Sequence, residues 1–383
     1  MVHRWNSQAA SKRTLTQSRP RARAAVASAA AIAALLGLAV NGGAAAARPG
    51  FAAGRPDALP GDPKLSDYKA PKSDRKVTVT PIEFTVENQL EPGSQYALRG
   101  FLYEPKGKEG CRSSVLQANH GASNGAWYWD IPYQQQAYSI ARHVAASGIP
   151  FLSLNKLGYG QPGHPFGSSD EPPGKTVTVE ALADASHQVT QQLRAMGYRH
   201  VGLIGHSAGS EESELQAGLY GDVDALILSG FTHLPTSGFA GEFVTKEQPR
   251  AMSEDYPYLF GDIETRDGFL FTENVDPTLV QALHPLVNET PSGEILSIGP
   301  LASRFVAPLV TASVLTLVAN DDLIFNPDGA SLDEAAFVSS DDVTFNRYDG
   351  VGHLLEFHRP TGPKVTADVV DWLADRPSVM PSC

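Results

Sequence analysis

The serine at position 207 stands in the sequence Gly-His-Ser-Ala-Gly, which fits the G-x-S-x-G pattern of a nucleophile elbow. A short apolar run at residues 200–204 precedes it and predicts a buried strand, and residues 210–220 predict a helix. A serine on so tight a turn is strained, and its flanking glycines let the strand and helix pass closely. Its hydroxyl is then exposed beside a positive helix terminus, where it can act as a nucleophile.

A serine hydroxyl needs a base within hydrogen-bond reach and an acid that orients the base. An elbow serine is followed in chain order by the acid and then by the histidine, each in a loop after a strand. The apolar run 314–318 leads to Asp321 and Asp322, and the run 343–347 leads to His353. The order therefore predicts a triad of Ser207, His353 and one of the two aspartates, although aspartate is also common in ordinary turns.

Two further residues are candidates for contact with a substrate. Trp127 follows a loop of small residues after the predicted strand 114–119. It either lines an acyl pocket or packs beneath that loop. His233 follows the predicted strand 225–228 and is a candidate to face the pocket.

The third predicted strand ends in His120-Gly121-Ala122. Together with the serine elbow and the ordered acid and histidine, this motif resembles the α/β-hydrolase fold family. The resemblance covers residues 77–230 and 310–375. The resemblance implies a secreted serine esterase or lipase-like enzyme. It places the acid three residues after a small residue, which favours Asp322, after Ala319, over Asp321. It also assigns the oxyanion to the backbone N–H groups of Ala122 and Ala208, and each such donor is worth about 3 kcal/mol.

The order of the elements predicts an α/β fold with a mostly parallel central sheet. Residues 76–87 and 96–103 predict an antiparallel hairpin, and residues 133–147 and 179–196 predict helices. The alternation stops at Gly230 and resumes at residue 312, which predicts an α/β-hydrolase core at 76–230 and 306–383 with a cap insertion at 231–305.

The predicted cap contains one short helical stretch at 277–283, no clear strand and many aromatic residues. Those aromatics form either an apolar lid over Ser207 or a small core of the cap itself. They are Phe231, Phe239, Phe243, Tyr256, Tyr258, Phe260, Phe269 and Phe271.

The N-terminus predicts export. Residues 1–47 contain six basic side chains, no acidic ones, an Ala- and Leu-rich run and A-x-A sites, as in a secretory signal peptide. The alternative is an uncleaved membrane anchor. Residues 48–75 predict a flexible lead-in.

The rest of the chain is acidic. Without the leader, 24 basic and 42 acidic residues leave a net charge of −18, which disfavours nucleic-acid binding. Export also permits a disulfide between Cys111 and Cys383, the only cysteines.

Taken together, the residues predict a secreted enzyme that cleaves a small, hydrophobic carboxylic ester, with no metal, no cofactor and no stable membrane partner. No His, Cys or Asp cluster has metal-ligand spacing, and no dinucleotide-binding glycine pattern follows a strand. The same triad also suits a lactonase, a thioesterase or an acyltransferase. A non-catalytic binding protein on the same fold is the alternative from a different class.

Overall fold

The computed structural model describes residues 71–383, apart from 135–136, 161–163, 166, 168–171, 254, 256, 260–261 and 299–300. The predicted signal peptide and residues 48–70 of the lead-in lie outside the described residues. No helix in the described part of the chain is long and apolar enough to cross a membrane.

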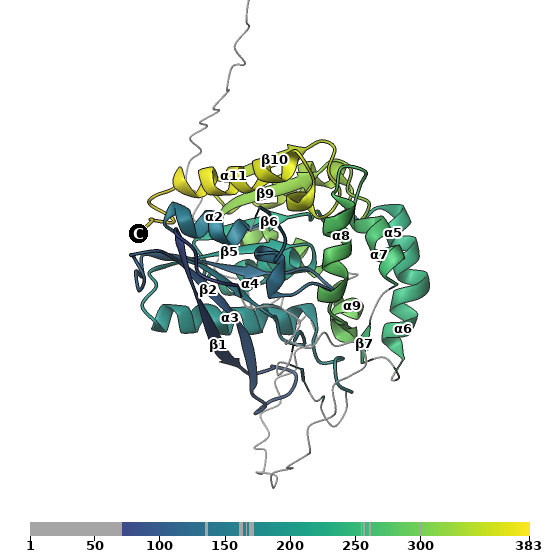
Figure 1. The fold of residues 1–383 in the computed structure, drawn as a ribbon. Coiled ribbons are helices and arrows are strands. Elements are labelled where there is room, and N and C mark those ends of the chain that lie inside the picture. The colour runs from purple at the N-terminus through teal and green to yellow at the C-terminus, as the bar shows by residue number, and fades with distance from the viewer. Residues whose placement is uncertain are drawn as a thin grey trace, which may run out of the picture. The chain divides into compact units, whose positions relative to one another are not determined.

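An eight-stranded sheet forms the centre of the fold (Figure 1). Its spatial order is β1-β2-β4-β3-β5-β6-β9-β10. The first two strands form the predicted antiparallel hairpin, β2 also pairs antiparallel with β4, and the other neighbours are parallel. The strands are β1 (Val77–Val86), β2 (Tyr96–Pro105), β3 (Ser114–Asn119), β4 (Phe151–Leu154), β5 (His200–His206), β6 (Ala225–Ser229), β9 (Ser313–Ala319) and β10 (Val343–Tyr348). The predicted mostly parallel α/β sheet is confirmed.

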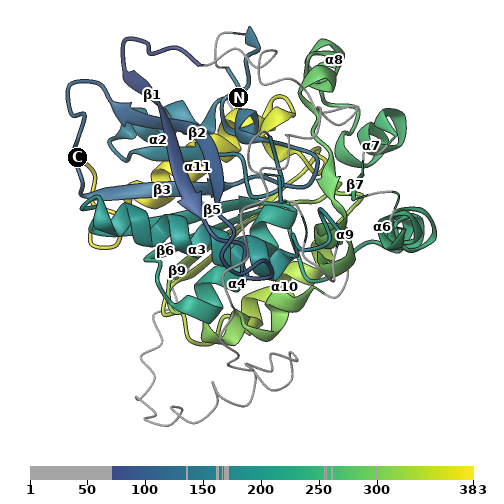
Figure 2. The ribbon, with the colours of Figure 1, turned by 90° about the horizontal axis from the view of Figure 1, so that it is seen from below.

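Helices cover both faces of this sheet, which explains why its central strands are buried along their length. Every residue of β3, β4 and β6 is buried. Figure 1 shows α11 (Thr361–Ala374) above the sheet, with α2 (Ile140–Ser147) beside it, and α3 (Val179–Ala195) below. In Figure 2, which is seen from below, α3, α4 (Ala208–Tyr220) and α10 (Ala330–Ala336) lie toward the viewer.

The helix predicted from residue 133 begins later, at Ile140. Ser139 caps it, because its hydroxyl accepts a hydrogen bond from the Arg142 N–H at 3.1 Å. Serine is among the preferred N-cap residues. The sequence prediction was wrong at this boundary because it extended the helix through the cap.

Residues 231–305, here called the insertion segment, lie between β6 and β9 and contain more regular structure than the sequence predicted. The helix at Pro277–Leu283 is confirmed as α8. The other helices are α5 (Ser237–Glu242), α6 (Gln248–Met252), α7 (Ile263–Leu270) and α9 (Ser292–Ile298), with a π-helical turn at Phe243–Glu247. A two-residue antiparallel pair joins β7 (Tyr258–Leu259) to β8 (Thr290–Pro291). These elements are too short for a periodic signal, although Thr236, Asp262 and Asp276 cap three of the helices.

A disulfide joins Cys111 to Cys383, with the Cα atoms 6.1 Å apart. It ties the C-terminus to the loop before β3. The Cys383 N–H also donates to the Gly148 carbonyl at 2.8 Å, and Lys108 donates to the Cys383 carbonyl at 2.8 Å. The disulfide that export would permit is therefore present in the structure.

Candidate active site

Ser207 occupies the sharp turn between β5 and α4. Its backbone has φ 54° and ψ −123°, an uncommon conformation for a residue with a side chain. Such strain persists only where the surrounding structure imposes it. A Cβ on Gly205 would lie 2.3 Å from the Gly209 carbonyl oxygen, and a Cβ on Gly209 would lie 2.2 Å from the Asn119 carbonyl oxygen. Only glycine fits at either position, so close backbone contacts explain why the motif has glycine at both.

Ala208 is the first residue of α4, and its N–H has no acceptor within the helix. Ala122 lies in the loop after β3, and no acceptor for its N–H is found among the described residues. Gly121, beside it, approaches the elbow so closely that a Cβ there would lie 3.0 Å from the Ser207 Cβ. The loop and the elbow are therefore in direct proximity.

Asp322 contacts His353 at a distance of 2.9 Å between Oδ2 and Nδ1. Both side chains are buried. The other carboxylate oxygen of Asp322 accepts the N–H groups of Ile324, at 2.7 Å, and Phe325, at 3.1 Å. Asp321 is exposed. Of the two aspartates that the sequence left open, it is Asp322 that reaches the histidine.

A buried polar network lies behind His353 and was missed by sequence reasoning. His206 Nε2 lies 3.1 Å from the His353 carbonyl oxygen, and the His206 ring stacks on Tyr128 with centroids 4.6 Å apart. Tyr128 donates to Glu356 at 2.6 Å, and Ser229 donates to the other oxygen of the same carboxylate at 2.9 Å. Burial raises the pKa of Glu356, and burial lowers the pKa of His206 well below its usual value. The neutral His206 ring therefore donates to the backbone of residue 353.

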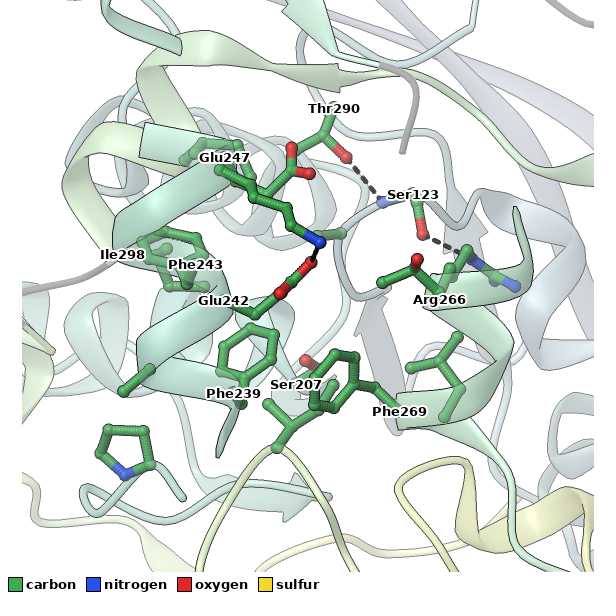
Figure 3. A pocket seen from close by; sticks show the side chains of 18 of the residues that line it. Ser123, Ser207, Phe239, Glu242, Phe243, Glu247, Arg266, Phe269, Thr290 and Ile298 are labelled. Atoms are coloured by element: carbon green, nitrogen blue, oxygen red, sulfur yellow. Dashed lines mark hydrogen bonds and ion pairs between the residues drawn. The ribbon is translucent and has the colours of Figure 1, made fainter. Parts of the chain in front are cut away.

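A cavity of about 580 Å³ opens over the elbow and is lined by Ser207, His353, His206 and Ala122. Figure 3 looks into it, and Phe239 and Phe269 pack there edge to face with ring centroids 5.5 Å apart. Its volume lies in the range of small-molecule sites. Its apolar lining comes largely from the insertion segment and includes Phe239, Phe243, Leu259, Phe269, Leu270, Ile295, Ile298, Leu301, Ile324 and Phe325. Of the eight aromatic residues noted in the sequence, three line the cavity, while Tyr256 and Phe260 lie outside the described residues.

The structure does not bring Trp127 to the cavity. Trp127 is 4% exposed and packs in the core beside Tyr128, with ring centroids 6.4 Å apart. Packing beneath the loop, the other interpretation of this residue, is the one that the structure favours.

His233 does not line the cavity either. Its Nδ1 lies 2.8 Å from Asp333, and its Nε2 lies 3.0 Å from Glu214 and 3.0 Å from Ser303. Although burial opposes the charged ring, Glu214 and Asp333 raise the pKa of His233 to about 10. Both ring nitrogens are engaged within the protein, so its placement as a pocket residue was wrong.

The three glutamates at the start of α4 are buried behind the elbow, away from the cavity. Glu214 pairs with His233 as described. Glu212 and Glu294 both contact Lys156 Nζ at 3.1 Å, and Tyr159 donates to Glu294 at 2.6 Å. Burial raises the pKa of Glu212 to about 7. These acids therefore join α4 to the insertion segment and to the loop after β4.

The described residues contain no group of three or more His, Cys, Asp or Glu side chains arranged to hold a metal ion. The site offers instead an elbow serine, a buried carboxylate–imidazole pair and an N–H group on a neighbouring loop. This set of groups is suited to acyl transfer.

The fold and this site define the class of protein. The model of the alpha/beta hydrolase family matches residues 120–364, well over half of the chain, and the chain belongs to that family. A comparison of the sequence with curated proteins finds no match.

Solved structures with the same fold include several hydrolases. An esterase from Thermogutta terrifontis is 20% identical with a TM-score of 0.55, and the alignment covers 77% of this chain and 98% of the esterase. A monoacylglycerol lipase from Paleococcus ferrophilus is 15% identical with a TM-score of 0.52, over 78% of this chain and 98% of the other. Rv0554 from Mycobacterium tuberculosis is 15% identical with a TM-score of 0.57, over 77% and 99%. At these identities the likeness shows the fold alone.

Proposed function

We propose that the protein is a secreted serine hydrolase that cleaves carboxylic esters through an acyl-enzyme. Ser207 is the nucleophile, His353 the general base and Asp322 the acid that orients it. One observation carries the proposal: the buried Asp322–His353 contact lies at the wall of the cavity that Ser207 also lines. Membership of the alpha/beta hydrolase family supports it.

In the proposed reaction the Ser207 oxygen attacks the ester carbonyl carbon while its proton moves to His353 Nε2. The carbonyl electron pair moves onto oxygen, and the N–H groups of Ala122 and Ala208 stabilise that charge. The intermediate collapses, and the alcohol leaves with the proton from His353. Water then attacks the acyl-enzyme, gives a proton to His353 and releases the acid, while Ser207 recovers its proton. Asp322 stabilises the imidazolium in both halves because it contacts Nδ1.

The proposed substrate is a small ester with a hydrophobic part. The volume of the cavity and its aromatic and aliphatic lining support this choice. Two similar structures belong to proteins named as an esterase and a monoacylglycerol lipase, which agrees with ester chemistry. We propose no cofactor and no metal for the reaction.

We also propose that the protein is exported through residues 1–47. The basic, acid-free start of the chain and the Cys111–Cys383 disulfide support this, since disulfides persist in oxidising compartments. An uncleaved anchor is the alternative. Mass spectrometry of the protein from both the culture medium and the membrane fraction of a secreting host separates the two by the presence or absence of the leader.

The proposal is tested with p-nitrophenyl esters of increasing acyl length. The wild type should turn them over, and Ser207→Ala should reduce kcat to background. Asp322→Asn should lower kcat by about 10⁴-fold, as when the orienting acid of such a triad becomes an amide. Asp321→Asn, the matched control one residue away, should leave kcat unchanged. Undiminished turnover by Ser207→Ala contradicts the assignment. Addition of alcohol acceptors distinguishes acyl transfer from hydrolysis by its products.

A further inference from the structure

The loop that contains Ala122 is held by the insertion segment. Arg266, on α7, donates from Nε to Ser123 Oγ at 3.0 Å and from Nη2 to Asn124 Oδ1 at 3.3 Å (Figure 3 shows the first contact). The Ser123 N–H donates to Thr290 Oγ1 at 3.0 Å, and its carbonyl accepts the Asn288 N–H at 2.9 Å. Two separate parts of the insertion segment, α7 and residues 288–290, therefore hold two consecutive loop residues.

The loop needs this support because its backbone is strained. The Asn124 N–H donates to the Gly121 carbonyl at 3.3 Å, so that Ala122 and Ser123 are the central residues of a turn. Ser123 has φ 59° in the third position, where glycine is favoured. A left-handed conformation is unfavourable for a residue with a side chain and persists only where the surroundings impose it.

Arg266 is suited to impose that conformation. Its side chain is 9% exposed, and its Nη1 pairs with Asp267 at 3.0 Å. Burial lowers the pKa of Arg266 to about 10, so the guanidinium remains charged at neutral pH. A planar guanidinium donates in fixed directions to two acceptors at once, whereas a lysine ammonium is a single point of charge on a flexible stem.

We infer that Arg266 is a positioning residue for the reaction: by holding Ser123 and Asn124 it keeps the Ala122 N–H directed at the site of the oxyanion. The inference rests on the proposed function. It means that the insertion segment determines the rate of the chemical step as well as the choice of substrate. Arg266 also lines the cavity, beside Ser123 and Asn124. The inference assigns its effect on the reaction to the loop that it holds.

The test compares Arg266→Met, Arg266→Lys and Arg304→Met with the wild type on one p-nitrophenyl ester. Arg304 is the matched control, because it is an exposed arginine of the same segment whose guanidinium lies over the Phe305 ring. We expect Arg266→Met to lower kcat by about 10- to 100-fold with little change in KM, less than the 10²–10³-fold effect of deleting a donor outright. Arg266→Lys should recover little of this loss, and Arg304→Met should leave kcat unchanged.

A double-mutant cycle with Ser123→Ala separates positioning from general destabilisation. Because Arg266 acts through Ser123, each single variant should lower kcat and the double variant should be little worse than either one. Multiplicative losses, an unchanged kcat in Arg266→Met, or an effect confined to KM overturn the inference. If Arg266→Met does not fold, Arg266→Lys and Ser123→Ala form the same cycle. The wild type and Ser207→Ala are assayed in parallel, since a wild type without Ser207-dependent turnover contradicts the proposed function instead.

Discussion

Replacement of His233 by glutamine provides a quantitative test of how the buried charges behind the elbow are paired. The imidazolium lies between Asp333, at 2.8 Å, and Glu214, at 3.0 Å. The side chain of Glu214 is fully buried and that of Asp333 is 7% exposed. Glutamine keeps hydrogen-bonding capacity but removes the positive charge, so the two carboxylates lose their shared cationic partner.

The size of the effect follows from the raised pKa. The pKa of His233 rises from 6.5 to about 10 on folding, so its charge stabilises the folded state fully below pH 6.5. At 1.36 kcal/mol per pKa unit, the contribution is about 5 kcal/mol at pH 6 and about 3 kcal/mol at pH 8. It is lost as the pH rises through 10. Removal of one partner from a buried ion pair costs about 3–5 kcal/mol, which agrees with the upper figure.

Urea denaturation of the wild type and His233→Gln at pH 6, 8 and 9.5 measures this contribution. The difference in unfolding free energy should be largest at pH 6 and fall to about 1 kcal/mol at pH 9.5, while KM for an ester changes little at pH 8. A difference that does not depend on pH would refute the charge argument. If His233→Gln leaves the stability unchanged and strongly raises KM, His233 contacts the substrate instead.

Two other replacements test the buried acid cluster and the disulfide. Burial raises the pKa of Glu212 from 4.5 to about 7, so the folded state binds a proton that the unfolded chain releases, and stability should fall by about 3 kcal/mol between pH 4.5 and 7. Glu212→Gln should flatten that part of the wild-type stability curve, and an unaltered curve would contradict the assignment. Replacement of Cys111 and Cys383 by serine should lower stability by about 5 kcal/mol, because the bond closes a loop of 272 residues. An unchanged melting temperature would contradict a stabilising role for the disulfide.

The sheet could be predicted from the sequence because its signals are local. Apolar runs such as residues 314–318 identify parallel strands, and Asp322 and His353 follow such runs in the order that the motif requires. The contact between Asp322 and His353 follows from this arrangement, since the ends of parallel strands meet at one edge of the sheet. The start of α2 was misplaced because one cap residue, Ser139, outweighs the apolar pattern around it.

The groups that support the site could not be predicted, since each depends on segments far apart in the chain. Tyr128 and Glu356 are 228 residues apart, and Arg266 is 143 residues from Ser123. His233 had the expected place after a strand, but no local pattern shows that two carboxylates occupy its ring nitrogens. Apart from α8, the helices of five to eight residues in the insertion segment are too short for periodicity to reveal them.

The most direct test of the central claim is covalent labelling with a fluorophosphonate, followed by intact mass measurement and peptide mapping. Such a probe reacts with a serine that is activated by a neighbouring base. The account predicts one adduct per chain, located on Ser207, in the wild type and in Asp321→Asn. It predicts no adduct in Ser207→Ala and strongly slowed labelling in Asp322→Asn. An adduct on another residue, or an unlabelled wild type, would contradict the assignment of Ser207 as the nucleophile.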